Sequence, residues 1–60
     1  MAEIERYKQV ENYLRLINIS IDEIKDRIDP EDEPDAANLI LDIEEAVENA
    51  IRFASRKQYG

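Results

Sequence analysis

An apolar residue recurs at alternating steps of three and four through the first half of the 60-residue chain. This spacing places the side chains on one stripe of an α-helix, and such a stripe packs against a second helix. It predicts a helix over about 3–28, with acidic residues at its start and basic residues at its end, as the helix dipole favours. The residues of this stripe, which we expect in the core, are Tyr7, Val10, Leu14, Ile17, Ile21, Ile24 and Ile28.

Two prolines interrupt this pattern. Pro30 disfavours helical geometry at Asp29 and cannot donate a backbone hydrogen bond, so the first helix is expected to end near Ile28. Residues 29–34 form an acidic turn, and Pro34 suits the first turn of a new helix. A turn this short brings two helices side by side and antiparallel. The core residues expected on the second helix, which covers about 35–58, are Ile40, Ile43, Val47, Ala50 and Ala54.

The predicted fold is therefore all-α: a single domain, residues 1–60, that forms an antiparallel two-helix hairpin. A chain of this length buries only about 60 % of the surface that its unfolded form exposes, so a second copy or a partner helix is expected to cover more. Seven apolar residues lie partly outside the intramolecular stripes and predict a second interface, favouring a dimer that forms a four-helix bundle. They are Tyr13, Leu16, Ile19, Leu39, Leu41, Ile51 and Phe53. The alternative is that they are scattered exposed apolar residues, which any protein surface carries.

Charge is distributed unevenly along the chain, whose net charge is −7. Residues 29–48 hold nine acids and no base, whereas residues 49–60 hold three bases and no acid. An acidic surface repels phosphate backbones, so direct nucleic-acid binding is not expected. No apolar run reaches the 18 residues of a membrane span, and we expect a cytoplasmic protein. Cysteine is absent, which excludes a disulfide and a thiolate metal site.

Two acidic patterns bear on a possible metal site. They are EExxE at Glu44, Glu45 and Glu48, and ExxD at Glu23 and Asp26. Together they resemble the Mg²⁺-binding helices of all-α nucleotide pyrophosphohydrolases of the MazG type. The order of the two patterns is reversed here, and this chain is much shorter than that fold. The neighbouring core positions turn the three glutamates outward, which predicts a solvated face instead.

The remaining candidates for chemistry are few. An EF-hand loop from Asp29 is excluded, because Pro34 and Ile40 stand where the glycine and the bidentate acid are needed. There is no histidine, and the two serines, Ser20 and Ser55, have no base to activate them. We therefore expect no enzyme, no cofactor and no metal site.

Two segments are similar to phage head-to-tail connector proteins, small all-helical adaptors that join a portal ring to a tail. One is Val10-Glu11-Asn12-Tyr13-Leu14-Arg15-Leu16, and the other runs from Leu39 to Ile51 and through Arg56-Lys57-Gln58-Tyr59. The resemblance covers about half of the chain, which lacks the later helices of that family. It implies ring assembly at the neck of a virion.

Of these hypotheses, the one that fits the chain best is a noncatalytic protein–protein interaction module. It associates with itself or docks on a partner helix, and a small regulator or inhibitor whose acidic surface competes for a basic site is one such role. The connector-like structural protein and the MazG-like fragment remain as alternatives. The sequence does not identify a partner.

Overall fold

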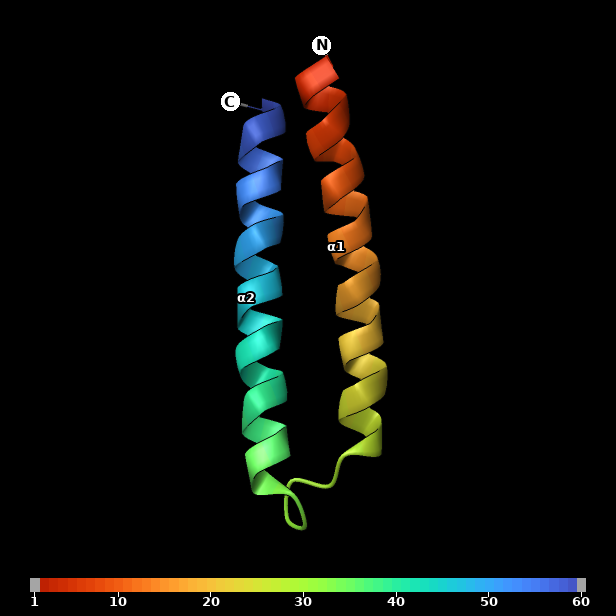
Figure 1. Cartoon of the computed structure of the whole chain (residues 1–60), viewed down its shortest axis with the longest axis vertical. Coiled ribbons are helices and arrows are strands. Elements are labelled where there is room, and N and C mark those ends of the chain that lie inside the picture. Colours follow the sequence, from red (N-terminus) through yellow and green to blue (C-terminus); the bar gives the residue numbers. More distant parts are fainter. Residues whose placement is uncertain (1, 60) are drawn as a thin grey trace.

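The computed structural model describes residues 2–59 as two long helices joined by a short turn (Figure 1). Helix α1 spans Ala2–Arg27 and α2 spans Pro34–Tyr59. They lie side by side and antiparallel in a rod of 48 × 15 × 11 Å, with the two chain ends together at one end and the turn at the other. This confirms the predicted helical hairpin. Met1 and Gly60, which the sequence interpretation includes in the domain, lie outside the described residues.

The turn is held by hydrogen bonds around Asp29. Its side-chain Oδ1 accepts a bond of 2.9 Å from the backbone N–H of Glu31, and its carbonyl accepts one of 2.8 Å from Glu33. Helix α2 then begins at Pro34, whose missing N–H is not needed in a first turn. The carbonyl of Glu33 accepts the N–H of Ala37 at 3.1 Å and so starts the α-helical bonding. The prolines end one helix and start the next, as their chemistry predicts.

Two polar contacts join the helices. Glu11 contacts Gln58 near the open end, and Lys25 contacts Glu44 nearer the turn. Each of these long side chains points toward the N-terminus of its own helix, so the backbones of the paired residues are not level. The helix ends, Ala2 with Tyr59 and Arg27 with Pro34, have numbers that add to 61, and Gln58 also reaches the carbonyl of Tyr7, a total of 65. Residues at the same height along the rod therefore have numbers that add to between these totals.

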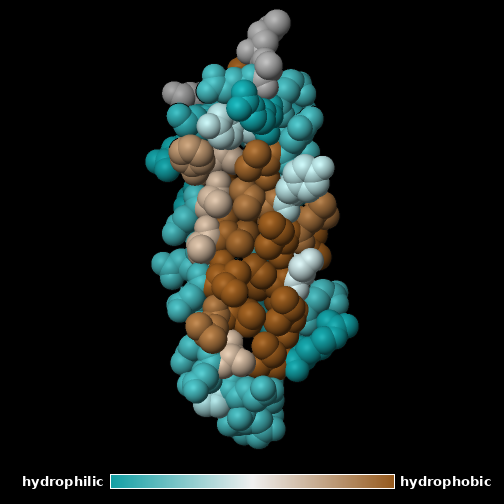
Figure 2. Space-filling model, viewed as in Figure 1, coloured by the Kyte–Doolittle hydropathy of each residue, from teal (hydrophilic) through white to brown (hydrophobic). Residues whose placement is uncertain are grey.

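The hairpin buries little on its own. Among residues 3–59 the side chains of Ile21, Val47 and Ala54 are buried, and five other expected core residues are half-buried. These five are Tyr7, Leu14, Ile28, Ile40 and Ala50. A compact monomer of this mass exposes about 4,000 Å², whereas the hairpin exposes 4887 Å². Apolar side chains gather along the middle of one face (Figure 2).

Within the described residues, neither helix is both long enough and apolar enough to cross a membrane.

Candidate interaction surface

The surface at which the helices meet is polar at regular intervals. On α1 the facing positions include Glu11, Asn18 and Lys25, each seven residues after the last, and on α2 they include Glu44 and Gln58. A step of seven returns to the same side of a helix that packs against another. Polar groups therefore alternate with apolar ones along the whole contact between the helices.

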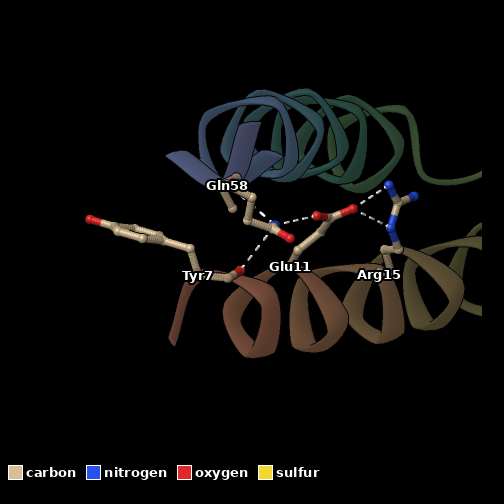
Figure 3. Close-up of polar contacts among 5 residues, drawn as sticks. Tyr7, Glu11, Arg15 and Gln58 are labelled. Atoms are coloured by element: carbon tan, nitrogen blue, oxygen red, sulfur yellow. Dashed lines mark hydrogen bonds and ion pairs between the residues drawn. The ribbon is translucent and has the colours of Figure 1, made fainter. Parts of the chain in front are cut away.

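The Glu11 side chain joins the two helices near the open end (Figure 3). Its carboxylate accepts a hydrogen bond of 2.6 Å from Gln58 Nε2 and bonds of 2.9 and 2.5 Å from Arg15 Nε and Nη2. Gln58 also donates to the carbonyls of Ala54, at 3.2 Å, and Tyr7, at 3.5 Å. The hydrogen bonds from Arg15 and Gln58 lower the pKa of the Glu11 carboxyl below its ordinary value of 4.5.

The Lys25 ammonium bridges the helices nearer the turn. Its Nζ lies 3.2 and 3.3 Å from the two carboxylate oxygens of Glu44. This contact differs from the expectation that Glu44 turns outward with Glu45 and Glu48, both of which are exposed. Glu44 is half-buried beside the opposite helix, because it lies three residues before the buried Val47 on the contact side of α2.

Asn18 occupies the contact between these two polar pairs. Its Oδ1 atom is buried and accepts no hydrogen bond from any residue of the described range 2–59. It is half-buried on the same stripe of α1 as Glu11 and Lys25. An unsatisfied buried polar group costs about 1–3 kcal/mol, so this position weakens the pairing of the two helices.

Four residues expected in the intramolecular core lie elsewhere. Val10, Ile17 and Ile24 on α1 and Ile43 on α2 are exposed in the single hairpin. On α1 they are each one residue, or about 100° of helical turn, from Glu11, Asn18 and Lys25, which take the contact positions instead. The physical reason is that polar groups pair across the helices at the contact, which turns this apolar stripe to one side.

Because both helices are rotated in this way, apolar side chains gather on one side of the rod. We call this surface the open face. Its members recur at steps of three and four on α2 and of three, four and seven on α1, and each helix carries them on the same flank of its contact line. Their exposed fractions include 46 % for Ile17, 48 % for Ile43 and 48 % for Phe53. The open face comprises Val10, Tyr13, Ile17 and Ile24 of α1 and Leu39, Ile43, Ala46, Ala50 and Phe53 of α2.

Figure 2 shows this side of the rod as an apolar strip that runs between polar ends and is bordered by polar side chains. The strip crosses both helices. Three of the seven residues expected in a second interface, Tyr13, Leu39 and Phe53, belong to it. The structure thus brings them together with the four displaced core residues on one continuous surface.

The other four expected interface residues lie elsewhere. Leu16 and Ile19 are exposed on the outer side of α1, away from α2. Leu41 lies on the opposite flank of the hairpin and lines a small hollow near the turn together with Ile28 and Ile40. Ile51 is half-buried at the contact between the helices.

Aromatic rings from the two helices make contact near the open end of the rod. The rings of Tyr7 and Phe53 meet edge to face, with centroids 5.9 Å apart and planes at 76°. Lys57 Nζ lies 5.5 Å from the centroid of the Phe53 ring. Phe53 therefore links the intramolecular contact to the open face. The neighbouring Arg52 donates a hydrogen bond to Asn49 on its own helix.

One glutamate of each acidic pattern makes an ion pair within the hairpin. Arg27 Nη1 lies 3.1 Å from Glu23, so one glutamate of the ExxD pattern is in an ion pair, and Glu44 of the EExxE pattern pairs with Lys25. Across residues 2–59 there is no group of three or more aspartate, glutamate, histidine or cysteine side chains that could hold a metal ion. Comparison of the chain with known protein families, curated proteins and solved structures gives no match.

Proposed function

We propose that this chain is a noncatalytic interaction module whose open face packs against the open face of a second copy. The product is a dimeric four-helix bundle. The observation that carries the proposal is the continuous apolar surface shared by both helices, with large side chains such as Ile17, Ile43 and Phe53 about half exposed. Exposed apolar patches of this kind, bordered by polar residues, mark interaction sites.

The area of the hairpin is consistent with one further copy. Its exposed surface of 4887 Å² exceeds that of a compact monomer of this mass by roughly 850 Å². A specific dimer buries about 800 Å² from each partner. Covering the open face once is therefore sufficient to bring the exposed surface to an ordinary value.

The open face also has the shape that helix packing requires. Ala46 and Ala50 form a line of small side chains on α2, where another helix approaches closely. Ile17 and Ile24 on α1 provide larger side chains beside it. Because two helices lying side by side form the face, its simplest complement is the same pair of helices in a second copy.

The test is the mass in solution of two matched variants. Ile17→Asp places a charge on the open face, whereas Ile19→Asp places the same charge on the outer side of the same helix. In a symmetric dimer the Ile17→Asp change occurs twice. With a loss of about 1.5–3 kcal/mol for each buried isoleucine side chain, the dissociation constant should rise at least a hundredfold.

Sedimentation velocity from 1 to 200 μM measures the mass of each variant, and circular dichroism on the same samples shows whether the variant is folded. Wild type and Ile19→Asp should have the mass of two chains, and Ile17→Asp the mass of one. If Ile17→Asp unfolds, Ile43→Asp on the other helix provides the same test. A wild-type monomer at 200 μM, a ring of many chains, or equal disruption by Ile17→Asp and Ile19→Asp would each overturn the proposal.

A further inference from the structure

We infer that the two hairpins pack with their turns at opposite ends of the bundle, so that each acidic turn lies beside the open end of the other copy. This inference rests on the proposed dimer and specifies its geometry. The open face alone allows two symmetric arrangements. The turns lie together at one end if the two-fold axis runs along the rod, and at opposite ends if the axis crosses it.

Charge separates these two arrangements. The half of the hairpin that contains the turn, residues 15–46, holds eleven acids and three bases, a net charge of −8. The remaining residues, 1–14 and 47–60, hold four acids and five bases, a net charge of +1. Placing the turns together sets −8 against −8 across helices only about 8–10 Å apart, a distance comparable to the screening length of about 8 Å in physiological salt. Placing them at opposite ends sets each acidic half against a nearly neutral one.

The apolar side chains are compatible with the second arrangement. The open face spans residues 10–24 of α1 and 39–53 of α2, with centres at Ile17 and Ala46. The numbers of these two residues add to 63, so the two centres lie close to the same level along the rod. One two-fold axis through this level therefore serves both helices at once.

That axis pairs α1 with α1 and α2 with α2 of the second copy. On α1 it sets Ile17 against Ile17 of the second copy. On α2 it sets Leu39 against Phe53 and Ile43 near Ala50 of the second copy, so large and small side chains meet across the face.

Distances between spin labels test the inference. The chain has no native cysteine, so single labels can be placed by Asp32→Cys at the turn and by Glu48→Cys near the level of the axis. Glu48 lies on the flank away from the open face, and its label should be roughly 20–25 Å from its copy in either arrangement, because two helix layers separate them.

Opposite-end packing predicts a separation of more than about 30 Å between the two turn labels, from the helical rise of 1.5 Å per residue. Same-end packing predicts about 10–20 Å. A short turn distance together with the expected Glu48 distance would overturn the inference and leave the dimer standing. Absence of any dipolar coupling from both positions at 200 μM would overturn the proposed dimer itself.

Discussion

The Glu11 carboxyl couples the stability of the hairpin to pH. Its carboxylate accepts hydrogen bonds from Arg15 of its own helix and from Gln58 of the other. These bonds lower its pKa in the folded state. A group whose pKa is depressed by folding contributes stability above its unfolded pKa and loses that contribution as the pH falls through the folded value. The contribution of Glu11 is thus complete at pH 7 and lost in strong acid.

We expect Glu11→Gln to lower the free energy of unfolding at pH 7 and to have little effect at pH 2. The glutamine keeps the size of the side chain but cannot act as an ionised acceptor for Arg15. Urea unfolding at the two pH values measures the change, and Glu45→Gln, an exposed residue of α2, is the matched control. A difference between wild type and Glu11→Gln that is equal at both pH values would contradict this account.

Each helix presents two candidate contact stripes, and this limits what the sequence alone predicts. The heptad spacing and the two prolines are sufficient to predict two antiparallel helices and the residues at which they are joined. The stripe through Leu14 and Ile21 can, however, be completed either by Val10, Ile17 and Ile24 or by Glu11, Asn18 and Lys25, since both sets satisfy the steps of three and four.

Hydropathy favours the first set, and the structure places the second at the contact. The deciding factor is complementarity between the helices: Glu11 meets Gln58, and Lys25 meets Glu44. No single helix shows this pairing in its sequence. A signal was nevertheless present, because a single antiparallel register lets both polar pairs form at the same time. The apolar stripe then becomes the open face, which explains why part of it was predicted as core.

The identity of the contact stripe can be tested at Asn18. Asn18→Leu removes a buried amide with an unpaired oxygen and adds apolar surface against α2. We expect the free energy of unfolding to rise by about 1–3 kcal/mol. Asn12→Leu, on the exposed outer side of α1, should gain no more than about 0.5 kcal/mol from helix propensity. Thermal and urea unfolding would measure both variants, and equal gains would show that Asn18 does not face α2.

For the molecule as a whole, the small buried core makes folding depend on association. A hairpin that buries three side chains among residues 3–59 gains most of its apolar burial in the proposed dimer. The melting temperature should therefore rise with protein concentration, by about 5 °C for each tenfold increase for two 60-residue chains that unfold as one unit. Calorimetry from 10 μM to 1 mM measures this rise. A constant melting temperature would indicate that the isolated hairpin carries the stability.

The short turn between Arg27 and Pro34 has a consequence for kinetics. It brings the helices together within one chain, so their pairing involves closure of a small loop and proceeds on a timescale of microseconds. Encounter of two hairpins is a bimolecular step, with a typical rate constant of about 10⁵–10⁷ M⁻¹s⁻¹. At micromolar protein the slow phase of refolding should therefore follow second-order kinetics, with a half-time that lengthens on dilution while the fast phase stays unchanged.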